Sequence, residues 1–121
     1  MYEDRIQWVT HKGKRIFYTD FSNLKSEQSI QMLAEVDIVI RKEPIGSVLM
    51  LGNYENSPFS MNTLTAFNKY TPEHQKYLKA NSMVGIKGLT KVMFDGASKF
   101  LKTEFRIFNT KEEALDWLAT K

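Results

Sequence analysis

The segment Ser47-Val48-Leu49-Met50-Leu51-Gly52 is a short, uninterrupted apolar run with a turn-forming residue at each end. An apolar run of this length between turn signals is typical of a strand that is buried on both faces. Strands of this kind occur in parallel sheets, where helices cover both faces. We therefore predict a central strand here, with helices before and after it.

Two elements are expected on the N-terminal side of this strand. Apolar residues recur at helical spacing from about Ser26 to Arg41, which predicts an amphipathic helix. Glu43-Pro44-Ile45-Gly46 ends that helix, because proline disfavours helical geometry in the residue before it. Further upstream, the apolar residues Ile6, Trp8, Ile16 and Tyr18 alternate with polar residues on either side of the turn His11-Lys12-Gly13-Lys14. This pattern predicts an antiparallel hairpin.

Three elements are expected directly after the central strand. The polar loop from Asn53 to Phe59 leads to a helix from about Ser60 to Tyr70. Thr71-Pro72-Glu73 predicts a break, because threonine caps helices and proline is tolerated at the first helical position. We expect a second short helix to end near Lys79, followed by a strand from Ser82 to Lys87.

The C-terminal part of the chain continues the alternation of helices and strands. Residues 89 to 101 show helical periodicity, and Phe105 to Phe108 form the last expected strand. Thr110-Lys111-Glu112-Glu113 resembles a capping box at the start of a final helix. We predict an α/β fold in which a mixed sheet, built from the N-terminal hairpin and then βα units, is flanked by helices.

Composition supports a single domain that spans residues 1 to 121. The chain is 42% hydrophobic and 26% charged, and no linker or repeat interrupts it. The absence of cysteine excludes a disulfide scaffold and a thiol nucleophile. No apolar run approaches the roughly 20 residues of a membrane span. The acidic start Met1-Tyr2-Glu3-Asp4-Arg5 lacks the pattern of a signal peptide, so we expect a cytoplasmic protein.

The net charge of +3 is concentrated between Lys69 and Lys102, where seven lysines face only Glu73 and Asp95. One interpretation is a solvated face that keeps the protein soluble, and the other is a patch that attracts an acidic partner. A nucleic-acid partner is disfavoured, because this segment contains no arginine and no aromatic RNA-recognition motif.

Two C-terminal segments and the hairpin carry a resemblance to a known family. The segments are Ser82-Met83-Val84-Gly85-Ile86-Lys87-Gly88-Leu89-Thr90-Lys91 and Phe105-Arg106-Ile107-Phe108-Asn109-Thr110-Lys111-Glu112-Glu113-Ala114-Leu115-Asp116-Trp117-Leu118. With Gly13-Lys14 and Tyr18-Thr19-Asp20-Phe21-Ser22, they are similar to SpoIIAA-like proteins of the STAS/SEC14 group. The resemblance covers nearly the whole chain. It implies a mixed sheet flanked by helices, in a superfamily that includes anti-sigma factor antagonists and cytoplasmic domains of anion transporters.

The chain departs from the pattern of this family at one functional motif. Regulatory members carry a phosphorylatable serine in an Asp-Ser-Ser-Gly-Leu type motif, between a strand and the next helix. The equivalent segment here, Asn53 to Ser60, lacks that motif. Ser57 and Ser60 are nevertheless candidate phosphate acceptors, because a helix N-terminus favours negative charge. The alternative is that Ser60 only caps the helix.

The loop from Asn53 to Ser60 is also the main candidate for an interaction surface. In an open parallel sheet, ligands bind outside the carboxyl ends of the strands. Tyr54 could present a flat amphipathic face to a partner, or it could fold back with Phe59 over the edge of the core. The candidate surface comprises Asn53, Tyr54, Glu55, Asn56, Ser57, Phe59 and Ser60. A second candidate, for a weakly bound anion, comprises Lys87, Thr90 and Lys91.

We expect no enzyme activity, cofactor or metal. His11 lies in the expected hairpin turn and His74 at the expected helix start, so both are predicted to be exposed. Metal binding would require a histidine to converge with a carboxylate, and no metal-binding sequence spacing is present. The chain also lacks the Gly-x-Ser-x-Gly elbow of hydrolases.

Two functions remain in view. The first is a non-enzymatic STAS-like regulatory module that docks another protein on the loop 53–60 and the following helix. The second, suggested by the SEC14 side of the resemblance, is a carrier or sensor of a small apolar ligand, which would need a cavity of at least roughly 300 Å³. Its expected lining is Phe59, Phe67, Phe94 and Phe100. A homodimer that pairs the N-terminal edge strand is a further possibility.

Overall fold

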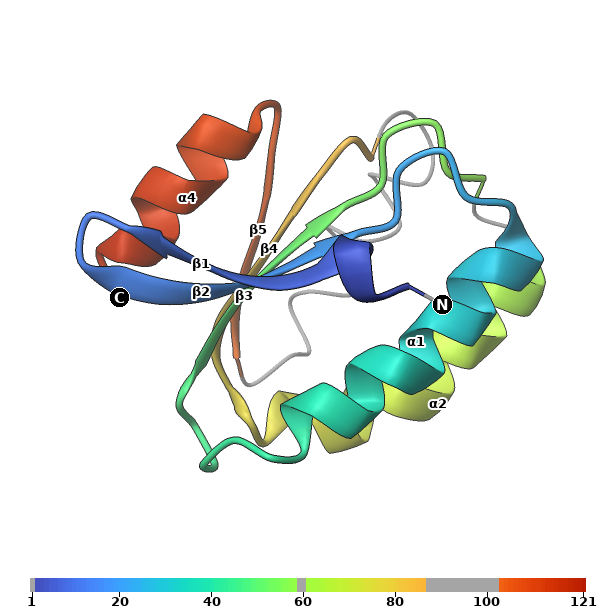
Figure 1. Ribbon diagram of the computed structural model, residues 1–121, viewed down its shortest axis with the longest axis horizontal. Helices are drawn as coiled ribbons and strands as arrows, with labels where there is room; N and C mark the ends of the chain where they lie inside the picture. The colour runs from blue at the N-terminus through green and yellow to red at the C-terminus, as the bar shows by residue number, and fades with distance from the viewer. Residues whose placement is uncertain (1, 59–60, 87–102) are drawn as a thin grey trace.

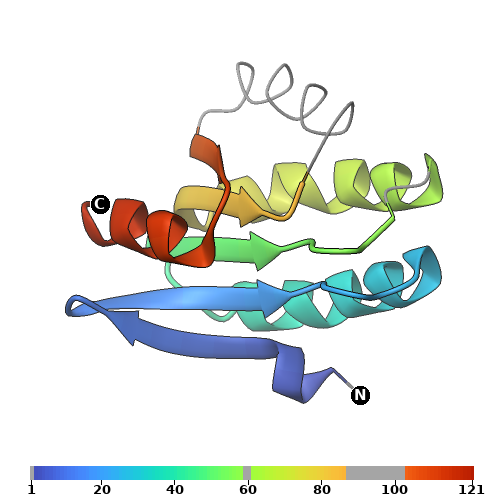
Figure 2. The ribbon, with the colours of Figure 1, turned by 90° about the horizontal axis from the view of Figure 1, so that it is seen from above.

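The computed structural model describes residues 2–58, 61–86 and 103–121. The elements are η1 (Glu3–Arg5), β1 (Ile6–His11), β2 (Lys14–Asp20), α1 (Ser26–Ile40), β3 (Val48–Asn53), α2 (Met61–Gln75), β4 (Leu78–Val84), β5 (Glu104–Phe108) and α4 (Lys111–Ala119). The strands form one sheet in the order β1-β2-β3-β4-β5 (Figures 1 and 2). β1 is antiparallel to β2, and the other neighbours are parallel. The expected α/β fold with a mixed sheet is confirmed.

Helices cover both faces of this sheet. α1 and α2 pack against each other on one face, and α4 crosses the other face, where it contacts all five strands (Figure 1). Side chains of β3 alternate between the two layers: Val48 and Met50 belong to the core beneath α1, whereas Leu49 and Leu51 belong to the core beneath α4. The predicted burial of this central strand on both faces is therefore confirmed.

The hairpin and the start of the final helix also follow the sequence prediction. The turn between β1 and β2 places Lys12 and Gly13 at positive φ, which glycine adopts without strain. At the start of α4, the backbone nitrogen of Glu113 donates to the Thr110 hydroxyl at 3.2 Å. The Glu113 carboxylate accepts from that hydroxyl at 3.0 Å, so it pairs with the capping side chain rather than with the backbone.

The expected break at Thr71-Pro72-Glu73 is wrong. α2 continues from Met61 to Gln75 with Pro72 inside it. Proline disfavours a helix interior because it removes one hydrogen bond and crowds the preceding turn, but its own φ is helical. Here α2 packs along α1 and is tied to it by a hydrogen bond between His74 and Asp37, two residues after the proline. These tertiary contacts offset the local cost.

The second short helix near Lys79 is also wrong, because β4 already begins at Leu78. The backbone nitrogens of Gly46 and Val48 donate to the carbonyls of Lys76 and Tyr77, both at 2.9 Å. This pairing with the chain before β3 draws the segment into the sheet four residues earlier than expected. The strand ends at Val84, whereas Lys87 and the predicted helix over 89–101 lie outside the described residues.

Within the described ranges, no helix is both long and apolar enough to cross a membrane.

Candidate functional site

The loops that follow β2, β3 and β4 meet at the carboxyl edge of the sheet. The backbone nitrogen of Phe21 donates to the Asn53 carbonyl at 2.8 Å, and that of Asn23 donates to the Glu55 carbonyl at 2.9 Å. On the other side, the Tyr54 nitrogen donates to the Val84 carbonyl at 2.9 Å. The ladder of hydrogen bonds thus continues beyond the strands into these loops.

Side chains reinforce the contact between the first two loops. Asn23 and Asn56 both have left-handed backbone, with φ of 59° and 54°, a conformation that asparagine adopts more readily than most residues. The Asn56 side-chain amide donates to Asn23 Oδ1 at 3.2 Å. The Ser57 hydroxyl lies 3.4 Å from both the Leu24 carbonyl and the Ser29 hydroxyl. The loop after β3 is therefore pinned to the loop after β2 and to α1.

Tyr54 lies beneath these loops rather than on their surface. Its side chain is only 4% exposed and stacks on Phe21, with ring centroids 4.9 Å apart. The ring centroid of Phe67 in α2 lies 5.8 Å from that of Tyr54. Burial raises the pKa of the Tyr54 phenol. Of the two alternatives left open by the sequence, the structure shows the one in which the Tyr54 ring folds back over the core edge. The other, in which the ring faces a partner, is wrong.

Two glycines that the sequence analysis did not assign to the site make this packing possible. A Cβ atom on Gly52 would lie 2.7 Å from the Tyr54 ring. Gly85 has φ of +82°, and a Cβ atom there would lie 2.8 Å from the Cα atom of Glu55. The signal for Gly85 was its place directly after an apolar strand, where an isolated glycine marks close backbone approach.

The groups left on the outside form a small polar surface. Asn23, Glu55, Asn56 and Pro58 are exposed, and Ser57 is half-buried. We call these five residues the strand-end surface. Phe59 and Ser60, which the sequence analysis placed in the same loop, lie outside the described residues. So does the proposed anion site of Lys87, Thr90 and Lys91.

Asn53 points toward the α4 side of this edge. Its side-chain amide donates to the Tyr18 hydroxyl at 3.3 Å, and its Oδ1 accepts from the Glu55 nitrogen at 3.0 Å. The ammonium group of Lys111 lies 4.1 Å from the centre of the Tyr18 ring, and burial raises the pKa of the Tyr18 phenol. Through these two hydrogen bonds, Asn53 stabilises the start of the loop after β3 and links it to Tyr18 of β2.

The expected exposure of His74 is wrong. This side chain is buried between α2 and α1, and its Nε2 lies 2.7 Å from Asp37 Oδ1. Its ring also stacks on Tyr70 with centroids 5.7 Å apart. A proline-containing segment looked like an exposed helix start, whereas tertiary packing places it inside a continuous helix.

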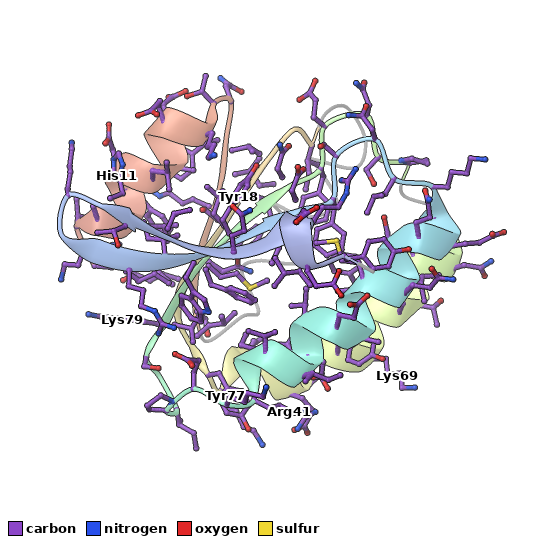
Figure 3. All side chains as sticks on the ribbon, viewed as in Figure 1. His11, Tyr18, Arg41, Lys69, Tyr77 and Lys79 are labelled. Atoms are coloured by element: carbon purple, nitrogen blue, oxygen red, sulfur yellow. The ribbon has the colours of Figure 1, made fainter. Side chains whose placement is uncertain are left out.

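His11 is likewise not the free turn residue that was expected. Figure 3 shows it at the end of the hairpin, beside α4. Its Nε2 lies 2.7 Å from Asp116 Oδ1, and the ring is half-buried. The hydrogen bond from His11 lowers the pKa of Asp116, and Lys12 adds to the effect. A histidine therefore does converge with a carboxylate in this fold.

The cavity that the described residues enclose under α1 and α2 is small for an apolar ligand. A cavity of about 60 Å³ lies between the sheet and the pair α1 and α2. Its lining includes Leu33, Met50, Phe67, Tyr70, His74 and Phe105. This volume is well below the roughly 300 Å³ at which ligand pockets begin. Of the expected lining phenylalanines only Phe67 is described, because Phe59, Phe94 and Phe100 lie outside the described residues.

Comparison with known proteins identifies the fold. No family model matches the sequence, and no curated protein matches it. A solved structure that resembles it is an uncharacterized protein from the DUF3478 family with a SpoIIAA-like fold, from Shewanella loihica PV-4. The TM-score is 0.75 at 21% sequence identity, over 93% of this chain and 91% of that chain. The expected SpoIIAA-like fold is thereby confirmed.

Proposed function

We propose that this chain is a non-enzymatic, STAS-like interaction module that docks another protein on the loop 53–60 and the helix that follows. The observation that carries the proposal is the network of backbone hydrogen bonds that orders the strand-end surface. Hydrogen bonds from Phe21 to Asn53, from Asn23 to Glu55 and from Tyr54 to Val84 fix its backbone. A surface that is ordered before binding loses less conformational entropy when a partner docks.

The chemistry of the surface also supports recognition rather than catalysis. Its exposed groups are two amides, one carboxylate and a proline ring, which can accept and donate hydrogen bonds. The aromatic rings of Phe21, Tyr54 and Phe67 lie beneath it as a stacked support. Backbone strain at Asn23 and Asn56 is maintained by their mutual hydrogen bond, and such strain concentrates at functional sites.

Ser57 is the proposed point of regulation. Its hydroxyl contacts the Leu24 carbonyl in the loop after β2 and the Ser29 hydroxyl in α1. A phosphate adds roughly two negative charges and does not fit between a carbonyl and a hydroxyl at 3.4 Å. Phosphorylation of Ser57 would therefore separate the loop after β3 from Leu24 and from α1, and would weaken docking of the partner.

Site-specific photo-crosslinking tests the docking surface. A photoreactive amino acid replaces Glu55 on the strand-end surface in the full chain, expressed in its own host. In the matched control it replaces Glu104, an exposed acid at the start of β5, at the opposite edge of the sheet. We expect a discrete protein adduct from position 55 that Asn56→Asp diminishes, and no such adduct from position 104. The same adduct from both positions, or none from position 55, would contradict the proposal.

A further inference from the structure

Three side chains of metal-binding types meet on the α4 side of the molecule, at the hairpin turn. His11 comes from the end of β1, whereas Glu112 and Asp116 come from α4. One ligand atom from each lies within 4.8 Å of the other two. Glu112 and Asp116 are four residues apart in one helix, so their carboxylates share a face. The third group, His11, is 105 residues distant in sequence from Asp116.

We propose that these three residues bind a divalent transition-metal cation of the Zn²⁺ type. One imidazole nitrogen and two carboxylate oxygens are a donor set that such ions accept, with a water completing the coordination. His11 Nε2 already lies 2.7 Å from Asp116 Oδ1, so the ring edge faces the carboxylates. When the ring proton is on Nδ1, the Nε2 lone pair is available to the ion.

Lys12 is the competitor for this position. Its ammonium group lies 3.0 Å from Asp116 Oδ1, and its side chain is 65% exposed. An exposed lysine gains little from such a pair and can withdraw into solvent, whereas a divalent ion contacts all three ligands at once. The site is therefore expected to bind metal more tightly when the charge of Lys12 is removed.

The imidazole determines which ions the site prefers. Mg²⁺ and Ca²⁺ take oxygen ligands and would have only the two carboxylates. Zn²⁺ gains the nitrogen of His11 as well. Because the bound ion would join the hairpin turn to α4, and the unfolded chain does not bring these residues together, binding should also raise the melting temperature.

Titration calorimetry of the metal-free full chain with ZnCl₂ tests the proposal. His11→Gln and Asp116→Asn should weaken Zn²⁺ binding by on the order of tenfold or more, since loss of even an outer-shell partner commonly has that effect. Lys12→Gln should strengthen binding. The matched control is Glu113→Gln, because the Glu113 carboxylate accepts from Thr110 and is outside the cluster. That variant should bind as the parent does.

Several outcomes would overturn the assignment. They are no Zn²⁺ binding by the parent below roughly millimolar concentration, equal binding by His11→Gln, or equal binding of Mg²⁺. Loss of folding does not complicate the test, because His11→Gln keeps a hydrogen-bond donor opposite Asp116 and its circular dichroism can be compared directly. A rise in melting temperature with Zn²⁺ that is absent in His11→Gln would support the site independently.

Discussion

Gly85, directly after β4, lies against the backbone of Glu55 in the loop after β3, so closely that a Cβ atom on Gly85 would be 2.8 Å from the Glu55 Cα atom. The positive φ of Gly85 brings the two segments together. This approach allows the Tyr54 nitrogen to reach the Val84 carbonyl. The geometry of the strand-end surface thus depends on the absence of a side chain at Gly85, directly after the neighbouring strand β4.

Gly85→Ala should destabilise the protein by more than the left-handed backbone alone would predict. Alanine in that conformation costs about 1–2 kcal/mol, and the contact with Glu55 adds to it because backbone cannot move aside easily. Chemical denaturation measures the free energy of unfolding. Gly46→Ala is the matched control: Gly46 has φ of +72°, and a Cβ atom there would meet no atom of the described residues within 4 Å. Equal losses in both variants would show that the close approach is unimportant.

Tyr54→Ala should behave as a core truncation and lower the free energy of unfolding by about 3–5 kcal/mol, the range for large aromatic residues. The reason is its burial among Phe21 and Phe67. Equilibrium unfolding in urea provides the measurement. Asn56→Asp, which changes an exposed neighbour, is the comparison and should cost far less. A Tyr54→Ala protein of parental stability would mean that the ring does not support the loops.

Acidification should lower the stability of the protein by weakening the contact between α1 and α2. Burial lowers the pKa of His74, although the hydrogen bond with Asp37 opposes this. Because the unfolded chain then binds a proton more readily, stability falls as pH drops below about 6.5, the ordinary pKa of histidine. The slope from this group cannot exceed about 1.4 kcal/mol per pH unit. Denaturation midpoints between pH 7.5 and 5 test this, and His74→Gln should show a shallower slope than the parent.

A second loss of stability is expected at lower pH, where Asp37 becomes protonated. Burial alone would raise its pKa, but hydrogen bonds from Arg41 and His74 outweigh burial, and the pKa is lowered. Its stabilising contribution is therefore present above about pH 4 and disappears as the pH falls through the lowered folded-state pKa. Asp37→Asn should remove this acid transition in the same denaturation series. An unchanged profile in that variant would place the transition on other carboxyl groups.

Thr110→Ala should cost about 0.5–2 kcal/mol, because it leaves the Glu113 nitrogen without its capping acceptor at the start of α4. Thr110→Ser keeps the hydroxyl and should retain most of the stability. Thermal denaturation of the three proteins gives the comparison. If serine and alanine were equally harmful, the methyl group of Thr110 rather than its hydroxyl would be responsible.

Elements with a strong local pattern could be predicted from the sequence. The hairpin, α1, β3, β5 and α4 follow from alternation, helical spacing, an apolar run and a capping threonine. The sequence also indicates the loop after β3 as a candidate surface, because polar residues follow a buried strand at the edge where ligands bind, and that assignment stays a prediction. Which side chains of that loop face outward could not be predicted, since Tyr54 and Glu55 differ by one position and have opposite exposures.

The periodicity and turn chemistry of the sequence by themselves determined the α/β class and the order of most elements, because those signals act over a few neighbouring residues. Only the tertiary structure decided that α2 passes through Pro72, that β4 begins at Leu78 and that His74 is buried against Asp37. It also decided the meeting of His11 with Asp116. Each of these features depends on contacts between segments that are distant in the sequence. The free energy of such contacts outweighs the local conformational preference, and the contacts produce no periodic pattern from which they could be predicted.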